Sequence, residues 1–250
     1  MSKLQHPDSR SFELVADLYE RSRPGYPREA VGWVARRLDL RAGRTVLDLG
    51  AGTGKLTRTL VETGASVLAV EPGDAMRAEL ELAVPEAESL RGSAEEIPIP
   101  DTSVDAITVG QAFHWFRHDE AIPELYRVLR PRCGIALLWN TRDRESPIQR
   151  AVSELIAPFA PPGRQPAPDS SRGIAASELF GPVEERRFPF EQELDADGLV
   201  KRIASISFVA AAAEDRRAAL EQELRRVVAS SEGTVSFPYV TEVYVSFAVD

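Results

Sequence analysis

The chain has 250 residues, of which 43% are hydrophobic, and carries a formal net charge of −9. No apolar run reaches the ~18 residues that a membrane helix needs, and no basic stripe is available to bind a polyanion, so neither membrane nor nucleic acid is an expected partner. The single cysteine, Cys133, cannot form an internal disulfide, and no signal segment opens the chain, which favours a cytoplasmic protein. Three histidines and one cysteine form no metal-ligand pattern, so no metal is predicted.

The apolar periodicity alternates between helix and strand over the first 140 residues. A helix is predicted over residues 11–20 and a second over residues 27–38, with a stop at Pro24-Gly25 between them. The elements predicted after them, in chain order, are strand 45–49, helix 55–63, strand 66–71, helix 74–83, strand 88–91, strand 105–110, helix 119–129 and strand 135–139. This alternation is typical of an α/β fold with a doubly wound, mostly parallel sheet.

The composition changes after Asn140. A stretch rich in proline, glycine and serine over residues 158–171 predicts a loop, and its position after the fifth strand suggests a lid over the ligand-binding edge of the sheet. A sixth strand is predicted over residues 188–193, helices over 199–206 and 218–228, and a last strand over 235–249. We expect a single domain, 1–250, with a core at 40–140, a cap on the substrate side at 141–232 and the last strand at 233–250.

The most informative segment is Asp48-Leu49-Gly50-Ala51-Gly52-Thr53-Gly54-Lys55, which follows the first buried strand. Glycines at a turn from strand to helix let the backbone approach a ligand closely. The third glycine comes too early for a dinucleotide fingerprint, and Lys55 is not followed by serine or threonine as in a phosphate-binding loop. A nucleoside-type cofactor without a pyrophosphate remains.

This loop resembles the first motif of the class I S-adenosylmethionine-dependent methyltransferases. The resemblance extends to four further segments, which are Tyr19 with Arg23-Pro24-Gly25-Tyr26-Pro27, Glu71, Gly92-Ser93-Ala94-Glu95 and Gln111-Ala112-Phe113-His114-Trp115-Phe116. They are most similar to the small-molecule branch that contains the trans-aconitate and the ubiquinone/menaquinone-type methyltransferases. The resemblance implies a Rossmann-like sheet of seven strands, with the last strand antiparallel and lying between the fifth and sixth.

The cofactor implied by the resemblance is S-adenosylmethionine, with S-adenosylhomocysteine as its product. Gly50, Ala51 and Gly52 would bring the backbone to the cofactor, and Asp48 would either reach the amino group of its methionine moiety or cap the turn. Glu71 follows an apolar strand, where a ribose diol would supply two hydroxyl donors to its carboxylate.

Other residues are predicted around the same cofactor. Pro72 follows Glu71, and Met76 would lie against the adenine face or simply pack in the core. The Ser93-Ala94-Glu95 segment resembles the family's adenine clamp, although Glu95 could instead belong to a turn before Pro98. Arg23 would pair with the methionine carboxylate, and Tyr19 would help to close that end of the pocket.

Gln111 and Ala112 begin the loop after the fourth strand, at the methyl end of the cofactor. His114, in the same loop, is the candidate general base; it could equally hold only the loop geometry, since methyl transfer to a nucleophilic atom depends mainly on positioning and desolvation.

The predicted activity is methyl transfer to a small-molecule acceptor, by O-, C- or N-methylation, in a monomer or homodimer. The alternative is a non-catalytic protein that binds the same cofactor on the same fold.

Overall fold

A computed structural model describes residues 23–161, 172–231 and 233–249. The helix predicted over residues 11–20 and the candidate ligand Tyr19 lie outside the described residues, as does most of the proline-rich segment. The first described helix, α3 (Arg28–Arg37), agrees with the helix predicted over residues 27–38. None of the described helices is both long enough and apolar enough to cross a membrane.

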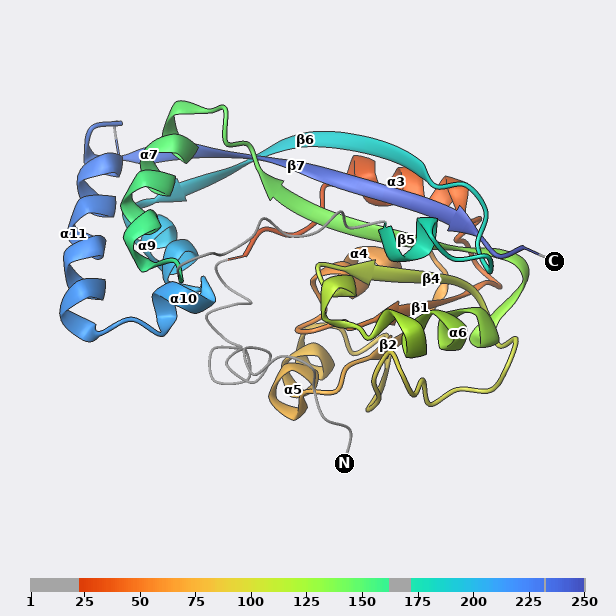
Figure 1. The fold of residues 1–250 in the computed structure, drawn as a ribbon. Coiled ribbons are helices and arrows are strands. Elements are labelled where there is room, and N and C mark those ends of the chain that lie inside the picture. The colour runs from red at the N-terminus through yellow and green to blue at the C-terminus, as the bar shows by residue number, and fades with distance from the viewer. Residues whose placement is uncertain (1–22, 162–171, 232, 250) are drawn as a thin grey trace.

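The described residues contain one sheet of seven strands in the order β3-β2-β1-β4-β5-β7-β6 (Figure 1). The strands are β1 (Thr45–Leu49), β2 (Ser66–Val70), β3 (Glu88–Leu90), β4 (Val104–Gly110), β5 (Leu129–Arg142), β6 (Glu184–Asp195) and β7 (Thr234–Phe247). The five strands from β3 to β5 are parallel, and β7 runs antiparallel to both β5 and β6. The mostly parallel fold and the place of the last strand are therefore confirmed.

The central strands are apolar because helices cover both faces of the sheet. On one face, α3 and α4 (Lys55–Val61) pack on alternate strand residues such as Val46 and Ala106. On the other face, α6 (His118–Val128) packs on the residues between them, such as Leu47 and Ile107. The helix predicted after the second strand is α5 (Asp74–Ala83).

Four helices gather beyond one end of the long β6–β7 ribbon, on the left of Figure 1. They are α7 (Pro147–Ile156), α9 (Ala196–Ala204), α10 (Ser207–Ala210) and α11 (Glu214–Ala229). We call them the helical cluster. Their apolar side chains form a core of their own with Phe237 and Tyr239 of β7, which are both buried. The cluster therefore lies beyond the carboxyl ends of the parallel strands and packs on the part of the β6–β7 ribbon that continues past them.

Several elements of this cluster differ from the sequence prediction. The helix predicted over residues 199–206 is α9, which begins three residues earlier, at Ala196, and ends at Ala204; the chain leaves helical geometry at Ile206, and the short helix α10, which was not predicted, follows. Helix α7 was not predicted, although its signals are present: Ser146 accepts a hydrogen bond from the backbone N–H of Gln149 at 3.2 Å, and Pro147 occupies the first turn.

Two strands are longer than predicted. Helix α6 ends at Val128, and β5 begins at Leu129, six residues before the predicted start. A register shift opposite Val104 and Ala106 accommodates Pro131, which cannot donate to a regular ladder. Strand β6 extends to Glu184 and Asp195 because it pairs with β7 along its whole length. Three short helices complete the described elements: η1 (Phe113–Trp115), η2 (Ala157–Phe159) and α8 (Arg172–Ala175).

Candidate functional site

The glycine loop after β1 has a left-handed backbone at three positions. The φ angles are 68° at Gly50, 58° at Gly52 and 85° at Gly54, values that glycine adopts without strain. A Cβ on Gly50 would lie 2.7 Å from the Cβ of Ala112, whereas a Cβ on Gly52 would meet no atom within 4 Å. The loop therefore packs tightly against the β4 loop at Gly50 and leaves space beside Gly52.

Glu71, the residue after β2, holds this loop in place. Its Oε2 accepts a hydrogen bond from the backbone N–H of Gly52 at 2.9 Å, and its Oε1 accepts one from the N–H of Gly73, also at 2.9 Å. The backbone N–H groups of Gly50 and Ala51 donate to the carbonyl of Val70 at 2.8 and 3.1 Å. A carboxylate oxygen can accept more than one hydrogen bond, so this side chain is of a kind that can hold the loop and also accept from ligand hydroxyls.

Asp48 lies beneath the loop and is 1% exposed. Thr57 donates a hydrogen bond to its Oδ2 at 2.6 Å, and Thr108 donates one to its Oδ1 at 3.2 Å. Burial raises the pKa of Asp48 to about 6, because the charged form loses its hydration, and the two hydroxyl bonds oppose the shift only in part. A nearby cation would favour the ionised form.

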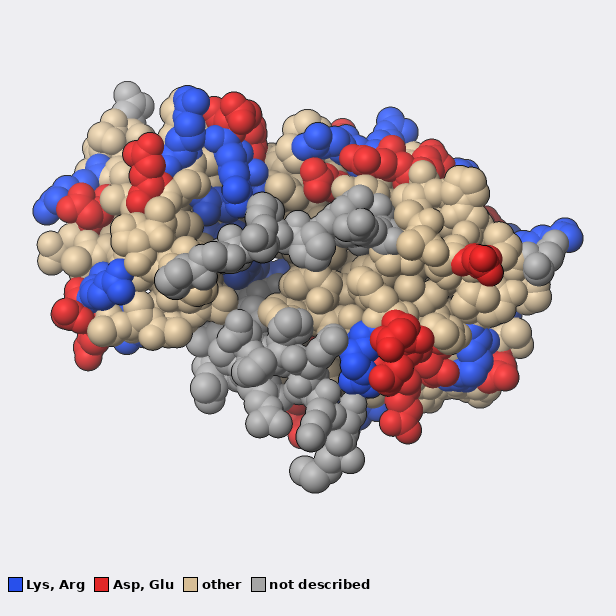
Figure 2. Space-filling view, in the orientation of Figure 1, with Lys and Arg blue, Asp and Glu red and all other residues tan. Residues whose placement is uncertain are grey.

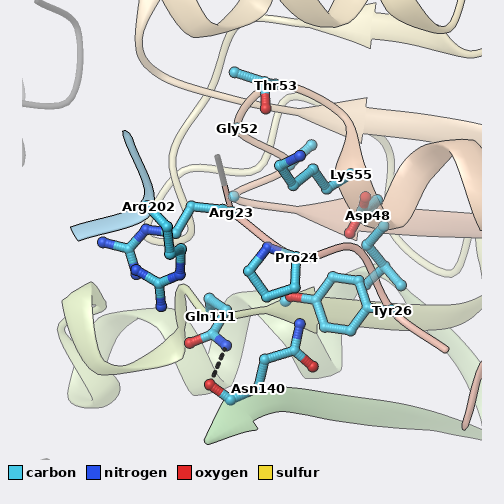
Figure 3. A pocket seen from close by; sticks show the side chains of 14 residues that line it. Arg23, Pro24, Tyr26, Asp48, Gly52, Thr53, Lys55, Gln111, Asn140 and Arg202 are labelled. Atoms are coloured by element: carbon cyan, nitrogen blue, oxygen red, sulfur yellow. Dashed lines mark hydrogen bonds between the residues drawn. The ribbon is translucent and has the colours of Figure 1, made fainter. Parts of the chain in front are cut away.

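A pocket of about 70 Å³ opens between the glycine loop and the helical cluster (Figure 3). It is lined by Arg23, Pro24, Tyr26, Asp48, Gly50, Ala51, Gly52, Thr53, Lys55, Leu56, Gly110, Gln111, Asn140 and Arg202. The sheet contributes the carboxyl ends of β1, β4 and β5. Strands β1 and β4 are neighbours where the strand order reverses, which is the place where open α/β sheets bind ligands.

The segment that precedes α3 closes one side of this pocket. A Cβ on Gly110 would lie 2.5 Å from Oη of Tyr26, so this glycine lets the tyrosine pack on the end of β4. Asn140 donates to the carbonyl of Gly25 at 3.0 Å and accepts from Thr241 at 2.7 Å. Gln111, with a φ of 58°, donates to the carbonyl of Asn140 at 3.2 Å. The floor of the pocket is thus a connected polar network.

Six of the predicted site residues line this pocket, and eight others do not. The six are Arg23, Asp48, Gly50, Ala51, Gly52 and Gln111. Those that are described but do not line it are Glu71, Pro72, Met76, Ser93, Ala94, Glu95, Ala112 and His114. Glu71 and Ala112 nevertheless contact the glycine loop directly.

The predicted adenine clamp lies in the loop after β3. Glu95 accepts a hydrogen bond from the backbone N–H of Arg117 at 2.9 Å, and so holds the start of α6. Ser93 forms an isolated bridge with Glu96, while the side chains of Ala94 and Met76 are buried. The adenine roles of these residues stay predictions.

His114 lies in η1 and packs among aromatic rings. Its ring centroid is 4.4 Å from that of Trp115 and 5.0 Å from that of Trp139. His114 is not among the residues that line the pocket, so its role as a base also stays a prediction.

Several lining residues were missed by the sequence prediction. Asn140 ends an apolar run in β5, and a polar residue at that position was a usable signal. Arg202 of α9 carried no such signal, because it is one of many arginines on amphipathic helices and lies 150 residues beyond the glycine loop. Within the described ranges, no group of three or more His, Cys, Asp or Glu side chains could hold a metal ion.

Comparisons with known proteins agree on one family. Residues 47–137 match the family described as "Methyltransferase domain". The chain is 39% identical to the uncharacterized methyltransferase Rv3342 of Mycobacterium tuberculosis over 238 residues, which cover 93% of each chain. It is 33% identical over 226 residues to the uncharacterized methyltransferase-like C25B8.10 of Schizosaccharomyces pombe, covering 88% of this chain and 86% of the other.

Two solved structures have a similar fold. A candidate type II methyltransferase from Anaeromyxobacter dehalogenans has a TM-score of 0.69 and 25% identity, covering 89% of this chain and 97% of the other. An N-methyltransferase from Haemonchus contortus, in complex with phosphomonomethylethanolamine and S-adenosylhomocysteine, has a TM-score of 0.56 and 14% identity, covering 98% of this chain and 58% of the other.

Proposed function

Because the chain belongs to the class I methyltransferase family, we propose that it transfers a methyl group from S-adenosylmethionine to a small-molecule acceptor. The observation that carries the choice of donor is the link between Glu71 and the glycine loop. A carboxylate beside an open stretch of backbone matches a ribose that presents two hydroxyls. The S-adenosylhomocysteine bound to the Haemonchus structure supports the same assignment.

The methionine end of the cofactor is assigned to the pocket. Gly52 leaves space there that a side chain would fill, and Asp48 supplies a buried carboxyl that an ammonium group would stabilise in its charged form. Arg23 lines the same pocket and supplies a planar guanidinium for the carboxylate of the cofactor. The carboxyl, the guanidinium and the open space beside Gly52 therefore fit a nucleoside that carries a zwitterionic amino acid.

When bound, S-adenosylmethionine would supply a methyl carbon on a sulfonium: the acceptor's nucleophile would bond to that carbon as the carbon–sulfur bond breaks in line, and S-adenosylhomocysteine would leave. The chain's own residues orient the two partners and exclude water from the space between them. The polar network of Gln111 and Asn140 fixes the sheet side of the pocket, and the helical cluster provides the opposite wall. The acceptor is assigned to the space next to the cluster.

Two measurements test the proposal. Calorimetry should show binding of S-adenosylhomocysteine and none of NAD. A screen of acceptor pools should then release S-adenosylhomocysteine from S-adenosylmethionine. Binding of the cofactor without release from any pool would favour the non-catalytic alternative, and absence of cofactor binding would overturn the proposal.

A further inference from the structure

Arg202, which lines the pocket, has a donor without an acceptor. Arg202 is 4% exposed, and its Nη1 is buried with no hydrogen-bond partner in the described part of the protein. Its Nε donates to Oη of Tyr239 at 2.7 Å, and the guanidinium lies 5.6 Å from the centre of that ring. A buried guanidinium normally has all its donors satisfied, since an unpaired donor and an unpaired charge are both costly to bury.

Two other arginines lie close to Arg202. Arg23 donates through Nη2 to the carbonyl of Ser205, which ends the same helix, at 2.9 Å. Arg142, at the end of β5, donates to the side chain of Gln149 at 2.5 Å and to Oγ of Ser153 at 3.0 Å. Burial, and then the positive charge of Arg202, lowers the pKa of Arg142 to about 10. Like charges therefore converge at this wall of the pocket.

Neither Arg202 nor Arg142 forms an ion pair with any carboxylate in the described ranges. The one acidic residue that lines the pocket, Asp48, lies on the opposite side from Arg202 in Figure 3 and bonds to two threonines. In Figure 2, basic side chains are visible in the recess between the helical cluster and the sheet. A protein with a net charge of −9 thus concentrates positive charge in one buried place.

We propose that the methyl acceptor is an anionic small molecule, and that Arg202 binds its carboxylate. The inference rests on the proposed function, because it assigns the acceptor end of the same pocket. A carboxylate would accept from the unpartnered Nη1 and offset the charge of Arg202 and of the nearby Arg142. Tyr239 positions the guanidinium by accepting from its Nε, which leaves the terminal nitrogens directed at the ligand.

The first test measures anion binding to the wild-type protein saturated with S-adenosylhomocysteine. The probes are acetate, malonate, succinate and glutarate, each compared with its uncharged amide by calorimetry at constant ionic strength. We expect at least one acid to bind roughly 10–100-fold more tightly than its amide, the factor that a hydrogen bond to a charged group supplies. If every acid binds no better than its amide, the proposal is overturned.

The second test assigns this binding to Arg202. Arg202→Lys keeps the charge but loses the planar fork, and Arg202→Gln loses both. We expect the glutamine variant to lose the preference for the acid and the lysine variant to retain part of it, while both bind S-adenosylhomocysteine with the affinity of the wild type. Lys201→Gln, which removes an exposed charge from the neighbouring position of α9, is the matched control and should keep the preference.

The outcomes separate this inference from the proposed function. If Arg202→Gln weakens S-adenosylhomocysteine binding as much as acid binding, Arg202 serves the cofactor and the inference is wrong. If the cofactor binds and neutral compounds are methylated as fast as acids, the inference is wrong and the methyltransferase proposal stands. If the wild type does not bind the cofactor at all, the proposed function fails first.

Discussion

The carboxylate of Glu71, at the end of β2, accepts a hydrogen bond from the backbone N–H of Gly52, in the loop after β1, at 2.9 Å. Its other oxygen accepts from the N–H of Gly73. One side chain thus connects the two loops that follow adjacent strands, and it does so at the edge where the cofactor is proposed to bind. The same residue is expected to shape the loop and to contact the ribose.

Glu71→Gln should therefore weaken binding of S-adenosylhomocysteine by about 1–3 kcal/mol, the range for a lost hydrogen bond to a charged acceptor. Glutamine keeps the size of the side chain but replaces one accepting oxygen with a donating amide, which cannot pair with a backbone N–H. Calorimetry on the variant and on Glu86→Gln, an exposed control, measures the difference. An affinity equal to that of the wild type would remove Glu71 from the cofactor site.

The contact between Gly50 and Ala112 gives a second prediction. Gly50→Ala should destabilise the fold by about 1–3 kcal/mol for the left-handed backbone, with an added cost because its new Cβ would lie 2.7 Å from that of Ala112. Gly43→Ala is the matched control, since Gly43 has a φ of 83° and open space around it. Urea unfolding should show the larger loss for Gly50→Ala.

The double variant with Ala112→Gly checks the cause of this difference. Removing the opposing methyl group should recover most of the extra stability that Gly50→Ala loses relative to Gly43→Ala, because only the backbone strain would remain. Failure of this rescue would show that the close contact is not what requires glycine at position 50.

The buried carboxyl of Asp48 predicts a dependence of stability on pH. The pKa of Asp48 is raised in the folded protein to about 6. As the pH rises, this carboxyl therefore ionises at a lower pH in the unfolded chain than in the folded protein. Its contribution to stability is fully present below the unfolded pKa of about 3.9 and is lost as the pH rises through about 6. Asp48→Asn cannot ionise, so this loss should be absent.

The measurement compares the free energy of unfolding of the wild type and Asp48→Asn, without ligand, at pH 4 and pH 7.5. The stability of the variant relative to the wild type should improve by about 2–3 kcal/mol between the two values, since one pKa unit corresponds to about 1.4 kcal/mol. Any constant penalty for placing an amide beside Thr57 and Thr108 cancels in this difference. A difference that does not change with pH would mean that Asp48 ionises normally in the folded state.

Substitution of His114 tests whether methyl transfer needs a general base. A carboxylate acceptor is ionised at neutral pH, and His114 packs on Trp115 and Trp139 rather than lining the pocket. We therefore expect His114→Ala to lower turnover by less than about tenfold, well short of the 10²–10⁴-fold loss typical of a missing general base. The wild-type rate should show no fall near the imidazole pKa of about 6.5.

Steady-state rates from pH 5.5 to 8.5, for the wild type and His114→Ala, decide between the two roles. A loss of 10²-fold or more with unchanged cofactor affinity, and a wild-type rate that falls on the acid side, would identify His114 as the base. That result would also indicate an acceptor with a proton to remove.

Much of the glycine-loop side of the pocket could be predicted from the sequence because its signals are local. The strand, the glycines and Glu71 all lie between residues 45 and 71, and buried parallel strands bring their carboxyl ends to one edge of the sheet. The early third glycine, Gly54, argued against a dinucleotide fingerprint, and Leu56 after Lys55 argued against a phosphate-binding loop. The position of β7 between β5 and β6 came from the family resemblance and is confirmed.

The wall of the pocket that carries Arg202 was decided only by the tertiary structure. Arg202 reaches the pocket because α9 packs through Leu199 and Ile203 on the buried rings of β7, and Tyr239 then holds its guanidinium. In the sequence, this arginine is one of several on an amphipathic helix, and its spacing says nothing about which side chain will be buried. A charge is costly to bury only where the fold removes water from it, and that place is set by contacts between residues that are far apart along the chain.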